Sequence, residues 1–149
     1  MLGFGEKAAE YFKMINPIEH SRTKEEARKY KVEPYVIPAD IYGAENLIGR
    51  GGWTWYTGSS SWYYEAGIKY ILGLTITKGV LTLEPCIPKE WSKYCIRYKF
   101  GESIYHINIT NPNKKSTGIT SMKLNGKEVE DKKIILTKDG GIYNIEVQI

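Results

Sequence analysis

The first thirty residues carry the spacing of amphipathic helices. Apolar side chains recur on one stripe of residues 6–15, which predicts a helix that Pro17 terminates. Thr23 stands three residues before Glu26, the spacing of a capping box, and the pair predicts a short polar helix that reaches about Tyr30.

Two further helices are expected before the middle of the chain. One spans residues 32–42, with Pro34 in its first turn, where a missing N–H costs little. The other spans residues 62–72, begins after Thr and Ser residues that can cap it, and is closed by Gly73. Between the two helices, the glycine-rich residues 49–52 predict a loop.

From about Gly79 the apolar positions alternate as they do in β-strands. Asn125 and Gly126 form the strongest local signal for a hairpin turn. Short strands are predicted over residues 80–83, 95–100, 104–109, 122–124, 127–129 and 142–149. We therefore expect an α+β chain, with a helical part over residues 1–78, a short join at 74–79 and an antiparallel β-sandwich over 79–149.

The helical part carries more apolar surface than one buried stripe needs. On the helix predicted over 62–72 these side chains spread widely around the axis: Trp62, Tyr63, Tyr70, Ile71 and Leu72. They pack either against the sandwich or against protein beyond this chain, and periodicity leaves both open. Because exposed apolar faces favour association, we expect a homo-oligomer or a partner chain that supplies missing helices.

Composition narrows the function classes. The 149 residues hold 21 basic and 17 acidic side chains, a net charge of +4 that is scattered, so nucleic acid is not an expected partner. No apolar run approaches the ~18 residues of a membrane helix, and no secretory signal is recognisable, so we expect a cytoplasmic protein without membrane contact. The two cysteines lack zinc-site spacing, and no metal site is expected.

Three consecutive residues suit an anion. Thr57, Gly58 and Ser59 precede the helix predicted over 62–72, where free N–H groups and the helix dipole favour a phosphate or sulfate. The same residues would also serve as an ordinary helix cap, and both interpretations stay open.

Aromatic and polar residues beside this cluster suit a sugar. Trp53 and Trp55 could stack on sugar rings, and the candidates for hydrogen bonds to hydroxyl groups are Asp40, Tyr42 and Arg50. Burial of the indoles in a core is the alternative. Asp40 and Glu33 are not fixed as an acid and base pair, so no catalytic residue is assigned.

Several motifs resemble the C-terminal end of glycoside hydrolase family 94. They are Val-Glu-Pro-Tyr-Val at 32–36, Gly-Arg-Gly-Gly-Trp-Thr-Trp-Tyr-Thr-Gly-Ser at 49–59, and Glu-Pro-Cys-Ile-Pro-Lys-Glu-Trp at 84–91. The longest motif looks most like the branch with cyclic β-1,2-glucan synthases and with chitobiose and β-1,2-oligoglucan phosphorylases. The resemblance implies the last helices of an (α/α) six-hairpin barrel followed by a C-terminal β-sandwich.

The resemblance also implies a chemistry. Family members cleave a β-glycosidic bond with inorganic phosphate as co-substrate, without a further cofactor, and invert the anomeric centre. An Asp protonates the leaving oxygen, and the family's phosphate-binding Thr-Gly pair matches Thr57 and Gly58. The family's catalytic Asp lies upstream of the stretch that matches this chain, and Asp40 does not take its place. We therefore expect a fragment that is inactive alone, or else a carbohydrate-binding or oligomerisation module.

Overall fold

The computed structural model describes residues 2–55 and 58–149, arranged in two compact units. One unit comprises Glu10–Gly67 and is called here the ribbon unit. The other joins Met1–Ala9 to Ile68–Ile149 and is called the sandwich unit. No helix among the described residues combines the length and the apolar character needed to cross a bilayer.

Two helices of the first thirty residues form as predicted. Helix α1 spans Gly5–Met14 and α2 spans Lys24–Tyr30. The capping box of α2 is complete, because Thr23 Oγ1 accepts from the Glu26 N–H at 3.1 Å and the Thr23 N–H donates to Glu26 Oε2 at 2.9 Å. Lys31 then ends the helix in the left-handed region, at φ 54°.

Within the ribbon unit an aromatic pair joins the end of α1 to α3, which spans Ser59–Glu65. The rings of Phe12 and Tyr63 stack with centroids 3.9 Å apart, and the Tyr63 hydroxyl donates to the Phe12 carbonyl at 3.0 Å. Burial raises the pKa of Tyr63 to about 12, so this donor stays protonated at neutral pH.

The helix predicted over residues 32–42 is wrong. The segment runs through a turn at 34–35 into strand β1, Asp40–Ile41, which pairs with β2, Gly51–Gly52. Pro38 would lack the helical N–H and clash with the carbonyl of residue 34, and this explains why the helix does not form. The prediction of a loop over 49–52 is also wrong at its end, because Gly51 and Gly52 form the second strand.

Helix α3 begins differently from the prediction but ends as expected. Its N-cap is Gly58, and among the described residues no side chain makes the capping hydrogen bond that the Ser residues were expected to supply. The helix continues as the π-helical turn η1, Ala66–Ile71. Gly73 then closes it at φ +79°, where an added Cβ would overlap the carbonyl group of Glu84.

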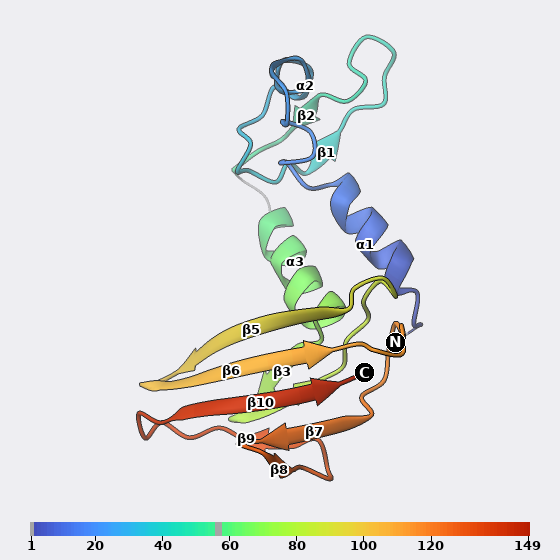
Figure 1. Cartoon of the computed structure of the whole chain (residues 1–149). Coiled ribbons are helices and arrows are strands. Elements are labelled where there is room, and N and C mark those ends of the chain that lie inside the picture. The colour runs from blue at the N-terminus through green and yellow to red at the C-terminus, as the bar shows by residue number, and fades with distance from the viewer. Residues whose placement is uncertain (1, 56–57) are drawn as a thin grey trace. The chain divides into compact units, whose positions relative to one another are not determined.

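The sandwich unit consists of two sheets that enclose a core (Figure 1). The smaller sheet has the order β3-β4-β9, with strands Leu74–Thr77, Val80–Leu83 and Lys133–Ile135. The larger sheet has the order β5-β6-β10-β7-β8, with strands Lys93–Phe100, Ser103–Thr110, Ile142–Gln148, Ser121–Leu124 and Lys127–Glu128. The fully buried side chains from both sheets include Leu81, Tyr105, Ile107, Met122 and Ile145.

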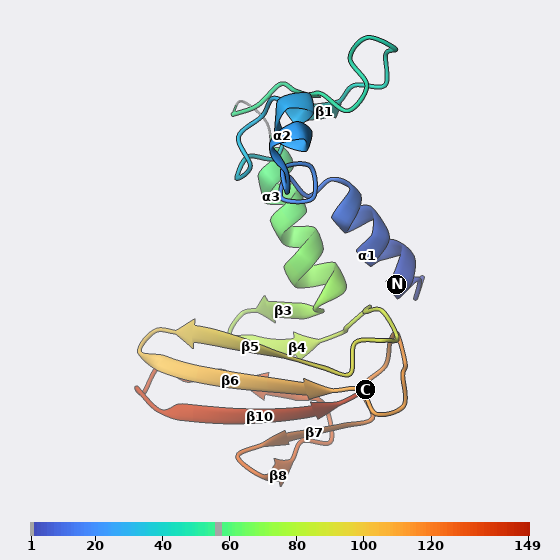
Figure 2. The ribbon, with the colours of Figure 1, turned by 45° about the horizontal axis from the view of Figure 1, so that its top comes forward.

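The sandwich confirms the predicted strands and corrects their arrangement. Residues 74–79, expected as a join, form β3 and a turn at Lys78 and Gly79 that leads into β4. The sheet is also not wholly antiparallel, because β10 runs parallel to β6, with Ile145 opposite Ile107 (Figure 2). A parallel pair needs a long crossover, here residues 111–141, and leaves no local signal in the sequence.

Candidate functional site

The short β1–β2 ribbon gathers three of the predicted sugar-binding residues. Asp40 pairs with Gly52, and the Tyr42 N–H donates to the Arg50 carbonyl at 2.8 Å. Opposed residues, and residues two apart on one strand, share a face of a ribbon. Asp40, Tyr42 and Arg50 therefore lie on one face, which we call the site face, and all three are exposed.

On the opposite face of the ribbon, Gly51 packs against the end of α2 and the residues after it, whereas Ile41 is 38% exposed. An added Cβ on Gly51 would overlap Val32 Cγ2 and lie 3.1 Å from Tyr30 Cε2, so glycine permits close packing there. Tyr30 itself is 1% exposed, and burial raises the pKa of its phenol. Tyr30 and Val32 thus pack behind the ribbon at Gly51.

Gly52 gives Tyr42 its position on the site face. An added Cβ on Gly52 would lie 2.7 Å from Tyr42 Cζ and overlap the hydroxyl oxygen. The phenol therefore lies against the glycine backbone. This contact holds the phenol above β2, on the same face as Asp40 and Arg50.

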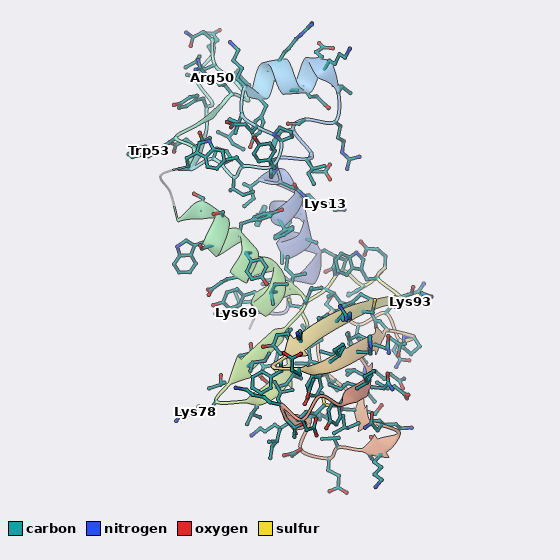
Figure 3. All side chains as sticks on the ribbon, turned by 90° about the vertical axis from the view of Figure 1, so that its left-hand side faces the viewer. Lys13, Arg50, Trp53, Lys69, Lys78 and Lys93 are labelled. Atoms are coloured by element: carbon teal, nitrogen blue, oxygen red, sulfur yellow. The ribbon has the colours of Figure 1, made fainter. Side chains whose placement is uncertain are left out.

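The chain leaves the ribbon with two exposed indoles. Trp53 and Trp55 both adopt positive φ, 51° and 71°, and are 69% and 65% exposed. Positive φ is unusual for a bulky residue and often marks a position where function outweighs backbone strain. Figure 3 labels Arg50 and Trp53 on this segment.

Trp55 is oriented by two residues that precede the ribbon. Its Nε1 donates to Glu33 Oε1 at 3.3 Å, and Tyr35 meets the indole edge-on with ring centroids 6.4 Å apart. Tyr35 was not foreseen in this role, because residues 32–42 were expected to be helical. The Val-Glu-Pro-Tyr-Val motif was its only signal. Glu33 thus positions an aromatic platform, and the indole is displayed rather than buried in a core.

Two of the three predicted phosphate-binding residues are described, and Thr57 lies outside the described residues. Gly58 is exposed and Ser59 is the first residue of α3. An added Cβ on Gly58 would have ordinary contact with Trp62, 3.7 Å from Cδ1, so the indole of Trp62 lies beside the start of α3. Among the described residues no group of three metal-ligating side chains is found.

Comparisons with known proteins place these residues in a family. Residues 1–73 match the glycosyl hydrolase 94 superfamily, catalytic domain, and residues 74–130 match the glycosyl hydrolase family 65, C-terminal domain. The chain is 40% identical over 117 residues to the cyclic beta-(1,2)-glucan synthase NdvB of Rhizobium meliloti (strain 1021), covering 78% of this chain and 4% of that protein. The chain belongs to glycoside hydrolase family 94.

Two other relatives of this family 94 chain carry phosphorylase names. The N,N'-diacetylchitobiose phosphorylase of Vibrio furnissii is 35% identical over 130 residues, 87% of this chain and 16% of the relative. The solabiose phosphorylase of Paenibacillus borealis is 26% identical over 135 residues, 90% of this chain and 16% of the relative. The chain thus spans about a sixth of these phosphorylases and corresponds to a C-terminal region of the family.

Proposed function

We propose that this chain supplies part of the sugar and phosphate sites of an inverting β-glycoside phosphorylase, which releases a sugar 1-phosphate. The observation that carries the proposal is the site face of Asp40, Tyr42 and Arg50, followed at once by the exposed indoles of Trp53 and Trp55. Two relatives named as phosphorylases support the reaction class.

The site face and the indoles have complementary roles toward a sugar. The flat faces of Trp53 and Trp55 stack on the C–H surface of a pyranose ring. Asp40 accepts hydrogen bonds from hydroxyl groups, Arg50 donates several, and the Tyr42 hydroxyl does both. Such a mixture of flat apolar rings and a few polar groups is typical of small-molecule sites.

Phosphate is assigned to the residues that lead into α3. The family's phosphate-binding Thr-Gly pair matches Thr57 and Gly58, and Ser59 adds a hydroxyl group beside them. In the reaction, inorganic phosphate attacks the anomeric carbon while an Asp elsewhere in the enzyme protonates the leaving oxygen. The products are a sugar 1-phosphate of inverted configuration and the shortened acceptor.

Phosphorolysis itself is assigned to a larger assembly than this chain. The carboxylate of Glu33 accepts a hydrogen bond from Trp55, and Asp40 stands opposite Gly52 in the ribbon, so neither is proposed as the general acid. We propose that the general acid comes from the remaining five-sixths of a phosphorylase, in the (α/α) barrel that this chain does not span. That barrel would receive the helices of the ribbon unit.

The test is the release of glucose 1-phosphate by the purified chain. The assay combines inorganic phosphate with β-1,2-, β-1,3- and β-1,4-linked glucosides, and an intact chitobiose phosphorylase with its own substrate serves as a control for the assay. We expect no product from the chain alone. Product above background would show that a general acid lies within these residues, and Asp40→Asn and Glu33→Gln would then be the first variants.

A carbohydrate-binding module is a second candidate, because the indoles of Trp53 and Trp55 are so strongly exposed. Oligosaccharide titration followed by tryptophan fluorescence tests it. Saturable binding that disappears in both Trp53→Ala and Trp55→Ala supports a sugar site here, and Tyr64→Ala, at a residue 68% exposed on α3, is the matched aromatic control. Fluorescence that no oligosaccharide changes would count against any sugar site on the ribbon unit.

Association is proposed on separate grounds. Four apolar side chains near the start of the ribbon unit are exposed: Tyr11 and Met14 on α1, and Ile15 and Ile18 in the turns after it. Because apolar patches of this kind favour association, we expect the isolated chain to form a homo-oligomer. Light scattering after size exclusion measures its mass, and a monomeric mass at all concentrations would contradict the expectation.

A further inference from the structure

The outer face of the larger sheet carries a row of polar side chains at the centre. Glu146 of β10 stands opposite Asn108 of β6 on one side and opposite Lys123 of β7 on the other. The neighbours of Asn108 and Glu146 along their strands point into the core, as the buried Ile107 and Ile145 show. The strand period therefore fixes this polar row on the side away from the core.

A second polar row lies directly beside the first. Gln148 of β10 stands opposite Thr110 of β6 and opposite Ser121 of β7. Side chains two apart on one strand are neighbours on one face, so the two rows form a continuous polar surface over three strands. Figure 1 shows β6, β10 and β7 side by side.

This surface is hollowed. A cavity of about 290 Å³ opens there, near the lower end of the roughly 300–1,000 Å³ that small-molecule sites occupy. Besides Val147, its lining consists of six polar residues, Asn108, Thr110, Ser121, Lys123, Glu146 and Gln148. The cavity lies wholly within the sandwich unit and is separate from the site face of the ribbon unit.

The polar groups of the cavity are available for a ligand. Thr110 Oγ1 donates to the Val147 carbonyl at 3.3 Å. The other five side chains make no hydrogen bond or ion pair with any part of the chain that the structure describes. Two amides, two hydroxyl groups, a carboxylate and an ammonium thus offer donors and acceptors in close alternation.

The charges of this surface indicate what kind of ligand fits. Lys123 and Glu146 are cross-strand neighbours of opposite sign, so the described lining carries no net charge that would favour an anion. No aromatic ring is among the described lining residues, so the cavity offers a nucleobase nothing to stack on. A hydroxyl group both donates and accepts, and a ring bearing several of them matches this lining.

We propose that the cavity on β6, β10 and β7 binds a neutral sugar unit of an oligosaccharide through hydrogen bonds to Asn108, Glu146 and Gln148. It is a second sugar-binding site, away from the ribbon, and its existence does not depend on the function proposed above.

Nuclear magnetic resonance titration of the full 149-residue chain tests the proposal. The probes are β-1,2-linked and β-1,4-linked glucose trisaccharides, added to the ¹⁵N-labelled protein, with inorganic phosphate as a separate arm. We expect at least one trisaccharide to shift amide signals of β6, β10 and β7 in a saturable way. Phosphate should leave these signals in place.

Variants assign the binding to the cavity. Glu146→Gln and Asn108→Ala should each weaken binding about tenfold, because the first replaces a charged acceptor by a weaker neutral one and the second removes an amide group. Asn144→Ala is the matched control, since Asn144 lies on the same face of β10 but outside the cavity, and it should leave the affinity unchanged. Exposed positions were chosen so that the variants fold, which their amide spectra will show.

Three outcomes would overturn the proposal. They are the absence of saturable shifts in the sandwich unit with either trisaccharide, equal affinity in Glu146→Gln and in the wild type, and equal shifts with phosphate alone. A variant carrying Trp53→Ala and Trp55→Ala separates the two sugar sites. Sandwich shifts that persist in it support the second site, and shifts confined to the ribbon unit support the first site alone.

Discussion

At the scale of single residues, Tyr30 carries a buried hydroxyl group that finds no hydrogen-bond partner among the described residues. An unpaired buried hydroxyl is costly, so removing it should not destabilise the protein. We expect Tyr30→Phe to leave the free energy of unfolding unchanged or to raise it by about 1 kcal/mol. Urea denaturation measures the difference.

Tyr63 offers the matched control for this prediction, because its hydroxyl donates to the Phe12 carbonyl at 3.0 Å in the same unit. Tyr63→Phe should therefore lower the free energy of unfolding by about 1 kcal/mol. A similar loss in Tyr30→Phe would show that the hydroxyl of Tyr30 is paired after all.

Asp139 makes the stability of the sandwich unit depend on pH. The Tyr143 hydroxyl donates to its Oδ2 at 2.6 Å, and the Gly141 N–H and the Ser103 hydroxyl donate to its Oδ1 at 2.9 and 3.0 Å. These three donors hold the pKa of Asp139 at about 2, below the value near 3.9 of an unfolded chain. The carboxylate therefore stabilises the fold fully above pH ~4, and this contribution is lost as the pH falls towards 2.

The variant Asp139→Asn removes this dependence. We expect it to unfold at lower urea concentration than the wild type at pH 7. The difference between the two urea midpoints should shrink from pH 4 to pH 2. Midpoints at pH 7, 4 and 2.5 measure both effects. A gap that stays constant over these pH values would mean that the carboxylate is not responsible.

At the scale of elements, the β1–β2 ribbon depends on Gly52 for the position of Tyr42. A methyl group at residue 52 would force the phenol away from β2, since it would lie 2.7 Å from Cζ. We expect Gly52→Ala to weaken oligosaccharide binding to the ribbon about tenfold, the size expected for one or two lost hydrogen bonds. Fluorescence titration measures it.

Gly43→Ala is the control for the ribbon, because an added Cβ at Gly43 meets nothing within 4 Å. It should bind like the wild type. If the Gly52 and Gly43 variants bound equally well, Tyr42 would have no part in the sugar site.

Local signals in the sequence predicted most of the elements. The capping box at Thr23, the hairpin turn at Asn125 and the strand β4 formed as expected, because each depends on residues a few positions apart. The helix predicted over residues 32–42 does not form, because Pro38 constrains the backbone and cannot continue a helix there. Where an apolar pattern that favours a helix meets a proline that cannot continue one, as in this segment, the proline decides the local structure.

The sequence suggested candidates for the site, but not how the fold arranges them. Aromatic and polar residue types marked Trp53, Trp55, Asp40 and Arg50 as candidates, yet the face that Asp40 shares with Arg50 follows from a strand register that the sequence does not indicate. The left-handed backbone of both indoles is equally invisible in the sequence, since Trp has no preference for it. Tyr35 joined the site only through its contact with Trp55 across the fold.

At the scale of the whole molecule, the two units differ in how much core they possess. The ribbon unit has two buried large apolar side chains among its described residues, Tyr30 and Val36. The sandwich unit holds nearly all of the remaining core, including Leu81, Ile107 and Ile145, and its strands pair over up to eight residues. Local stability follows buried apolar contacts and protected backbone hydrogen bonds.

Hydrogen exchange should therefore separate the two units. We expect amides of β6 and β10 to exchange slower than those of α2 and the β1–β2 ribbon, by a factor on the order of 100 or more. Mass spectrometry of peptides from deuterated protein measures both in one sample. Equal protection would mean that the ribbon unit is stabilised by contacts beyond its own core. A partner that binds the folded protein but not the unfolded protein stabilises the part that it covers. A barrel-forming partner should therefore slow hydrogen exchange in the ribbon unit and leave exchange in β6 and β10 unchanged.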